Sequence, residues 1–136
     1  MKVILDTNVI VSGIFWKGAS EKVLYAWADD KFKLVISSGI ITEIIKTLMN
    51  FKIKLPFDDI LLWLSVLLWK AELVEPEERV DVIKDDPDDN KFIEAAIEGN
   101  AGYIVSQDKH LLNIKEYKGI KIILRKDFLE VLKDNY

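Results

Sequence analysis

Two kinds of hydrophobic pattern alternate along the chain. Short uninterrupted apolar runs, such as residues 3–5 and 34–36, are typical of strands that are buried on both faces of a sheet. Between them lie segments in which apolar residues recur at three- and four-residue intervals, and this spacing predicts amphipathic helices. The order at the start of the chain is therefore strand, helix, strand, helix. The predicted strands are residues 2–5, 34–36, 73–74, 103–105 and 120–124.

The start of the first predicted helix depends on the segment that follows residue 5. Asp6-Thr7-Asn8 is a polar sequence that usually ends a strand, and glycines at 13 and 18 then predict a loop. Ser20 can cap a helix after that loop, because its hydroxyl can accept a bond from a free amide of the first turn. The apolar residues between 40 and 48 predict the next helix.

Later helices are predicted from prolines, glycines and apolar stripes. Pro56 suits the start of a helix whose apolar face, up to Lys70, is wide enough to predict burial on two sides. Residues 75–89 are polar and predict a long loop, followed by a helix that Gly99 closes. The last helix is expected to be capped by Asp127. Strands that alternate with helices favour a parallel sheet with helices on both faces.

Length and composition set limits on the class of protein. The chain has 136 residues and a hydrophobic content of 50%. We therefore expect residues 1–136 to form a single domain with one core. The most apolar stretch, residues 60–69, is about half the length that a membrane-spanning helix needs. The chain has no cysteine and its start lacks the organisation of a signal peptide. These features predict a cytoplasmic protein without a membrane segment.

The charge of the chain matters for any phosphate-bearing substrate. Nineteen Lys and Arg against 23 Asp and Glu give a net charge of −4, which argues against a broad basic face for nucleic acid. Such a substrate would need another source of positive charge at its binding site.

Four carboxylates from distant parts of the chain are predicted to meet at one edge of the sheet. Asp6 and Asp108 each follow an apolar strand, and loops at the carboxyl ends of parallel strands converge. Glu43 lies about one turn into the helix after the second strand, and Asp89 lies just before the helix that contains Phe92. Both of these helices are expected to begin at the same edge.

Each acid also has an explanation that requires no function. Asp6 and Asp108 could bind backbone amides of their loops, and Asp89 could be a solvated residue or a helix cap in the run 85–89. Glu43 stands among isoleucines, where a carboxylate without a partner is costly. Because Pro87 favours an extended residue before it, we expect Asp85 and Asp86 to face solvent.

Convergence of the four acids favours a metal site over these separate explanations. Carboxylates at one edge would repel one another unless a divalent cation lay between them. Oxygen ligands suit Mg²⁺ or Mn²⁺, and a single histidine, His110, with no cysteine argues against zinc. Such a site can activate water and stabilise the charge that develops on a phosphoryl group, and its cation would supply the missing positive charge.

Three motifs resemble the PIN domain. They are residues 3–9 (Val-Ile-Leu-Asp-Thr-Asn-Val), 86–92 (Asp-Pro-Asp-Asp-Asn-Lys-Phe) and 105–109 (Val-Ser-Gln-Asp-Lys). The likeness covers nearly the whole chain and is greatest to single-domain prokaryotic proteins classed as toxin components of toxin–antitoxin systems, related to VapC-type toxins. It implies a three-layer α/β/α fold with a mostly parallel sheet of four to five strands.

The resemblance also implies an activity and residue roles. It implies a Mg²⁺- or Mn²⁺-dependent endoribonuclease that cleaves RNA, with an antitoxin protein as a possible partner. The acids that match the family's metal-binding positions are Asp6, Glu43, Asp89 and Asp108, and the polar residues that match its supporting positions are Asn8 and Ser106. The family often has Thr in place of Ser106, and this branch commonly has Asp in place of His110, so a fifth carboxylate is in doubt.

Three other classes compete with this interpretation. A haloacid-dehalogenase-type phosphatase needs Asp-x-Asp after its first strand, whereas the third residue here is Asn8. A receiver domain normally has two adjacent acids there, and this chain has one. A PIN-like module that binds RNA or protein without catalysis is the serious alternative, and the full set of four acids argues against it.

Aromatic and basic residues add little to the functional prediction. The tryptophans at helical spacing are more typical of a core or subunit interface than of base stacking. Together with the many Ile and Leu residues on the helices, they make a homodimer plausible. Five lysines could guide RNA toward the acids, although a solvated surface residue is the commoner explanation for any one of them: Lys46, Lys52, Lys54, Lys91 and Lys109.

Overall fold

The computed structural model describes residues 1–135 and contains a mixed α/β fold around one sheet. The strand order is β3-β2-β1-β4-β6-β5, and every neighbouring pair is parallel except β5 with β6. The strands are β1 (Lys2–Leu5), β2 (Lys33–Ser37), β3 (Glu72–Val74), β4 (Tyr103–Val105), β5 (Glu116–Tyr117) and β6 (Ile120–Ile123). The helices are α1 (Thr7–Phe15), α2 (Ala19–Ala28), α3 (Ser38–Met49), α4 (Phe57–Lys70), the short 3₁₀ helix η1 (Pro87–Asp89), α5 (Asn90–Gly99), α6 (Lys109–Leu112) and α7 (Arg125–Asn135).

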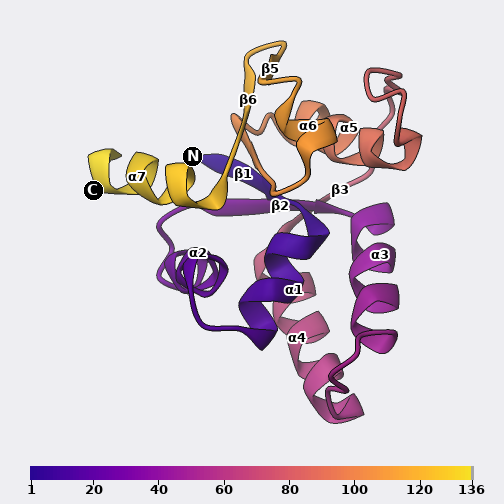
Figure 1. The fold of residues 1–136 in the computed structure, drawn as a ribbon, viewed down its shortest axis with the longest axis vertical. Coiled ribbons are helices and arrows are strands. Elements are labelled where there is room, and N and C mark those ends of the chain that lie inside the picture. Colours follow the sequence, from indigo (N-terminus) through magenta and orange to yellow (C-terminus); the bar gives the residue numbers. More distant parts are fainter. Residues whose placement is uncertain (136) are drawn as a thin grey trace.

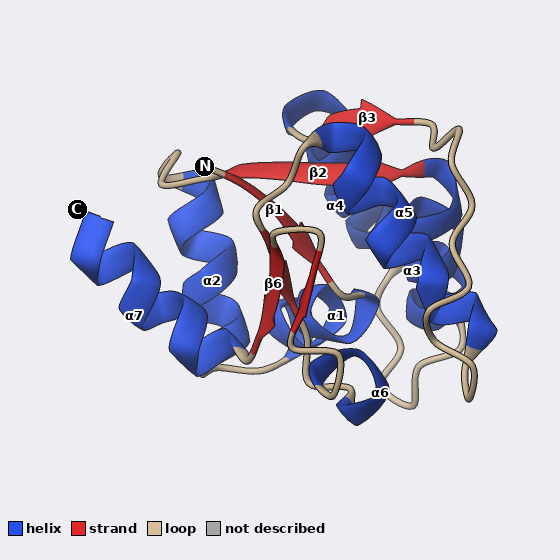
Figure 2. Cartoon of the chain, turned by 90° about the horizontal axis from the view of Figure 1, so that it is seen from above, coloured by secondary structure: helices blue, strands red, loops and turns tan. Residues whose placement is uncertain are grey.

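Helices cover both faces of the sheet, which confirms the predicted three-layer α/β class (Figure 1). Helices α1 to α4 lie on one side of the strands and α5 lies on the other. Seen from above, α2 and α7 lie side by side at one end, away from α3, α4 and α5 (Figure 2). No helix within residues 1–135 is long and apolar enough to cross a membrane.

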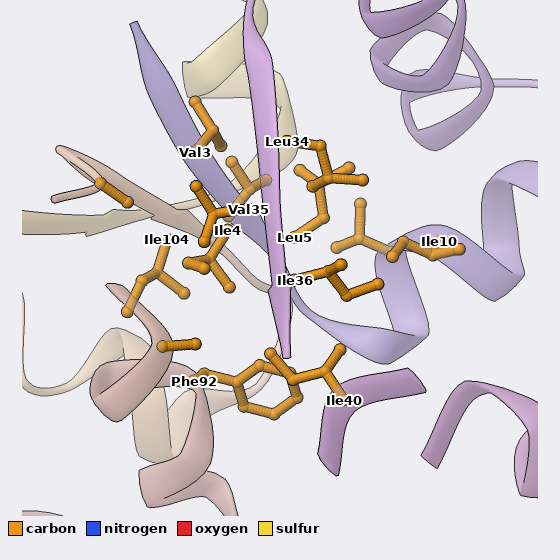
Figure 3. Close-up of a cluster of buried hydrophobic side chains, with 14 of the residues drawn as sticks. Val3, Ile4, Leu5, Ile10, Leu34, Val35, Ile36, Ile40, Phe92 and Ile104 are labelled. Carbon is orange, nitrogen blue, oxygen red and sulfur yellow. The ribbon is translucent and has the colours of Figure 1, made fainter. Parts of the chain in front are cut away.

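The core is built on the central strands β1 and β2, as their apolar runs predict. Ile4, Val35 and Ile104 are at most 1% exposed, and Phe92 from α5 and Ile40 from α3 pack near the end of β2 (Figure 3). Helix α5 can approach the sheet closely because it ends in Gly99. A Cβ atom at that position would lie 2.5 Å from Cγ1 of Val35.

The sheet has six strands, one more than the sequence indicated. The additional strand is β5, which has only two residues and pairs with β6 in a hairpin. Lys118 and Gly119 form its two-residue turn with φ angles of 49° and 83°. Positive φ at both positions is the requirement of a type I′ turn, whose twist matches that of a hairpin. The Lys-Gly sequence gives a weaker signal for this turn than Asn-Gly would.

The predicted loop after residue 5 was wrong as far as residue 15, because α1 begins at Thr7, and only residues 16–18 form a loop before α2. Asp6 is the N-cap of α1, with a side chain that accepts a bond from the Asn8 amide. Ser20 does not cap α2: Gly18 occupies that position, and the Ser20 hydroxyl accepts a bond from Arg125 instead. Gly13 lets α1 pack closely on α2. A Cβ atom at this position would clash with Leu24 of α2, at 2.6 Å.

Two further details differ from the sequence predictions. Asp127 lies inside the first turn of α7 and not before it, because α7 begins at Arg125. Helix α4 is not buried on two sides: Ile60 and Leu67 are buried, whereas five large apolar side chains are between 45% and 85% exposed. These exposed side chains, which we call the α4 apolar face, are Phe57, Leu61, Leu62, Leu68 and Trp69.

Candidate metal centre

The carboxyl ends of β1 and β4 place Asp6 and Asp108 at the same edge of the sheet. Leu5 and Val105 are paired in the parallel register, and the Asp6 amide donates to the Val105 carbonyl at 2.9 Å. Ser106 joins the two loops. Its hydroxyl donates to Oδ2 of Asp6 at 2.6 Å and accepts from the Asp108 amide at 2.9 Å. The predicted convergence of these two strand ends is therefore present in the structure.

Asp6 is a buried carboxylate that its surroundings hold in one orientation. The side chain is 5% exposed, and its Oδ1 atom accepts from the Asn8 amide at 3.2 Å. Burial raises the pKa of Asp6 above its ordinary value. The bonds from Ser106 and Asn8 oppose this pKa shift, and the charges of Glu43 and Asp108 add to it. The contribution of Asn8 comes from its backbone, so any residue except proline could supply it.

Glu43 reaches the same edge from the first turns of α3. Ser37, the last residue of β2, caps this helix by accepting from the Ile40 amide at 3.4 Å. Both carboxylate oxygens of half-buried Glu43 have partners: the Thr7 hydroxyl donates to Oε2, and Lys91 Nζ lies 2.6 Å from Oε1. Thr7 was absent from the sequence prediction, although its place in the first motif was a signal that could have indicated it.

Lys91 bridges Glu43 and Asp88 at the start of α5. Its Nζ atom lies 2.7 Å from Oδ2 of Asp88, and its side chain is only 17% exposed. Burial alone would lower the pKa of Lys91, but the bonds and charges of Asp88 and Glu43 outweigh burial and raise it. The pKa of Asp88 is lowered, mainly by its bond to Lys91. Lys91 is therefore a fixed positive charge beside the acids and not a mobile surface lysine.

Asp89 is buried and incompletely paired. It ends η1 directly before α5, is 8% exposed, and has an Oδ2 atom that is buried without a hydrogen-bond partner among the described residues. Burial, followed by contact with the Asp108 carboxyl group and the charges of Asp86 and Asp6, raises the pKa of Asp89 to about 8. An unpaired buried carboxylate oxygen is costly unless a ligand satisfies it.

Asp86 is the acid that the sequence prediction placed wrongly. We expected Asp85 and Asp86 to face solvent, and Asp85 does, but Asp86 is half-buried. Asp86, Asp89 and Asp108 each offer one carboxylate oxygen, and these three oxygens lie within 4.8 Å of one another. The reason is that residues 83–87 are held against α5 and do not form a loose loop.

Asn90 provides that attachment. Its side-chain oxygen accepts from the amides of Val82 and Ile83, at 3.0 and 2.9 Å. Its side-chain nitrogen donates to the carbonyls of Ile83 and Pro87, at 3.1 and 2.9 Å. A buried amide with four bonds is fully satisfied and fixes the conformation of the segment it binds. Asn90 therefore sets the position of Asp86 relative to Asp89.

The donor set at this edge fits a hard divalent cation. The close groups are carboxylates, one of them with an unpaired buried oxygen, which is the arrangement that Mg²⁺ or Mn²⁺ would satisfy. His110 gives no reason to expect zinc here, because its Nδ1 atom lies 3.9 Å from exposed Asp85. Asp6 is near enough for its charge to raise the pKa of Asp89, and Glu43 is near enough for its charge to raise the pKa of Asp6.

A cavity beside the acids is lined by two lysines and two carboxylates. Its volume is about 320 Å³, and its lining consists of Gly39, Thr42, Glu43, Lys46, Asp88 and Lys91. A polyanion that lay in this cavity would meet both lysines next to Glu43.

Comparisons with known proteins agree with this arrangement. A family model for the PIN domain matches residues 2–110. An uncharacterized protein of Methanocaldococcus jannaschii is 31% identical over 127 residues, which are 90% of this chain and 81% of that protein. Among solved structures, VapBC2 from Rickettsia felis, bound to a DNA fragment from its promoter, matches with a TM-score of 0.61 and 16% identity. That match covers 90% of this chain and 97% of the other, and it shows a similar fold.

Proposed function

This chain belongs to the PIN domain family, and from that premise we propose that it is a metal-dependent endoribonuclease. The reaction would be hydrolysis of RNA phosphodiester bonds with Mg²⁺ or Mn²⁺ as the cofactor. The single observation that supports this best is the buried, unpaired oxygen of Asp89 beside Asp108. We take residues 1–136 as one nuclease domain, because the buried residues form one hydrophobic cluster around one sheet.

The proposed ligands are the four acids that match the family: Asp6, Glu43, Asp89 and Asp108. A divalent cation bound there would activate water and stabilise charge on the scissile phosphate. The bonds from Ser106 and Asn8 would keep Asp6 oriented, and Thr7 and Lys91 would keep Glu43 oriented. Preorganised ligands lose less freedom when the substrate complex forms.

Lys46 and Lys91 are the proposed contacts for the RNA backbone near the acids. Both line the cavity beside Glu43, and Lys91 is held there by Glu43 and Asp88. Phosphate contacts by lysines supply affinity without sequence preference. A protein of net charge −4 would in this way still present positive charge beside the site of cleavage.

We further propose that this nuclease is the toxin component of a toxin–antitoxin pair. The similarity in fold to VapBC2, which extends over 90% of this chain, supports this proposal. An antitoxin would be the protein partner. Coexpression with a candidate antitoxin should abolish RNA cleavage by the wild-type protein, whereas cleavage that continues in a stable complex would contradict this assignment.

The α4 apolar face supports a homodimer. A contiguous exposed patch on one helix is typical of a protein interface. Asp58 and Asp59 lie in the first turn of α4 and Lys70 in the last. Two copies packed antiparallel about a two-fold axis would place opposite charges together. Light scattering should show a dimer that Leu62→Glu dissociates, while Tyr25→Glu, at an exposed position on α2, leaves it intact. A wild-type monomer would refute the homodimer.

The alternative function is an RNA- or protein-binding module without catalysis. One experiment separates the two: chelator-treated protein is resupplied with Mg²⁺ or Mn²⁺ and incubated with a total-RNA pool, and the new ends are sequenced. We expect cleavage at defined positions with metal, none with chelator, and none for Asp6→Asn. Equal cleavage by wild type and Asp6→Asn would indicate a contaminating nuclease, and RNA binding without cleavage would support the alternative.

A further inference from the structure

We propose that Asp86 is an additional cation ligand, which with Asp89 and Asp108 forms a subsite on the α5 side of the centre. This inference rests on the proposed metal-dependent function and extends it to a residue outside the four acids. It also assigns Asn90 a positioning role, because Asn90 holds the segment that contains Asp86.

The first support is the geometry of the three carboxylates. One oxygen from each of Asp86, Asp89 and Asp108 lies within 4.8 Å of the others. Oxygens that bind one Mg²⁺ ion at about 2.1 Å are at most about twice that distance apart, so a small inward movement would bring the three to one ion. Asp85, the neighbour of Asp86, lies outside this group and is exposed.

The second support is the pairing state of the acids. Asp6 receives bonds from Asn8 and Ser106, one on each oxygen. Both oxygens of Glu43 have partners too. Asp89, which is more than nine-tenths buried, instead has an oxygen without a partner in the described part of the chain. A ligand is therefore most needed on the side of Asp89, where Asp86 and Asp108 also lie.

The third support is the rigidity of the segment that brings Asp86 there. Asn90 bonds to the backbone on both sides of Asp86, at Ile83 and at Pro87. The Asp89 amide closes the turn by donating to the Asp86 carbonyl at 3.0 Å. Rigid placement of a third acid beside two others would be unfavourable without a cation, and with one it provides a preorganised site.

The experiment is Mn²⁺ titration by calorimetry on residues 1–136 after chelator treatment. Asp86→Asn keeps the shape of the side chain and removes its charge, and Asp85→Asn removes one charge from the adjacent exposed position. We expect Asp86→Asn to weaken Mn²⁺ binding by at least about tenfold and Asp85→Asn to change it by less than about twofold. Thermal unfolding in chelator should show that Asp86→Asn is folded, because the substitution removes a repelling charge.

The outcomes distinguish this inference from the proposed function. If Asp89→Asn and Asp108→Asn lose Mn²⁺ binding while Asp86→Asn matches Asp85→Asn, the additional ligand is refuted and the four-acid centre remains. If the wild-type protein does not bind Mn²⁺, both proposals are wrong. An Asp86→Asn variant that does not fold is replaced by Asp86→Ser, for which the same weakening is expected and wild-type affinity overturns the inference.

Discussion

The two sides of the acidic centre differ in how their carboxylates are satisfied. On the side of β1 and α3, Asp6 and Glu43 accept bonds from protein donors on all four of their oxygens. On the side of α5, Asp89 has a buried oxygen with no partner among residues 1–135, and two more aspartates lie close to it. The protein itself therefore stabilises one side, and we propose that a bound cation would complete the other. This contrast indicates which substitutions should affect metal binding and which should affect orientation.

The largest effect is expected from Asp89→Asn, which removes charge where protein donors are fewest. We expect RNA cleavage to fall by about three orders of magnitude and Mn²⁺ affinity by about a hundredfold, because a buried ligand and its charge are lost. Asp88→Asn should have a smaller effect, because Lys91 loses one of its two acidic partners and keeps Glu43, and Asp85→Asn should have almost none. Cleavage by the three variants at limiting and saturating Mn²⁺ checks this order. A more damaging substitution at 85 or 88 would mean that the motif has been assigned in the wrong register.

The second effect concerns stability in the absence of metal. Asp89 has a pKa of about 8 in the folded protein against an ordinary value of 3.8, so the folded state binds more protons between these two pH values. The free energy of unfolding therefore falls by up to a few kcal/mol as pH rises from about 4 to 8. Above pH 8 it no longer changes through this group. Asp89→Asn should flatten this slope. Denaturant unfolding in chelator at several pH values measures it, and a wild-type slope that equals that of Asp89→Asn would contradict the assignment.

The sequence predicted the location of Asp6 and Asp108 better than it predicted the helices around them. Asp6 and Asp108 were placed correctly because strand ends in a parallel sheet converge, which requires only the order of elements. The helix α1 was missed because Asp6-Thr7-Asn8 and Gly13 resemble loop sequences. That helix packs on α2, and this tertiary contact is not visible in the local pattern. Propensity is a weak guide where packing of this kind decides the structure.

The position of Asp86 could not be obtained from spacing at all. The rule that proline favours an extended preceding residue was a reason to place Asp86 in a loose loop. What holds the segment is Asn90, through four bonds to backbone groups. Asn90 stood in the recognised motif, but a motif gives no information on which backbone groups its side chain will bind. Asn90 lies eight residues after Val82, seven after Ile83 and three after Pro87, and these separations follow no periodicity that a sequence pattern could reveal.

The smallest effect is expected from substitution of Ser106, which supports the hydrogen-bonded side of the centre. Ser106→Ala removes the hydroxyl that joins Asp6 to the Asp108 loop, so Asp6 would be less well oriented and cleavage should fall by about tenfold. Ser106→Thr keeps a hydroxyl and should restore most of the rate. Single-turnover cleavage at saturating Mn²⁺ gives the comparison. Equal loss in both variants would show that packing around buried Ser106, and not its hydrogen bonds, is what matters.

The position of a bound ion tests the contrast between the two sides most directly. Crystals grown with Mn²⁺ and measured near the manganese absorption edge would locate the ion by its anomalous signal. We expect a peak about 2.1 to 2.2 Å from a carboxylate oxygen of Asp89 and of Asp108, with the Ser106–Asp6 bond retained. A peak that contacts Asp6 and Glu43 but lies beyond reach of Asp89, or a fully soaked crystal with no peak at this edge of the sheet, would contradict the account.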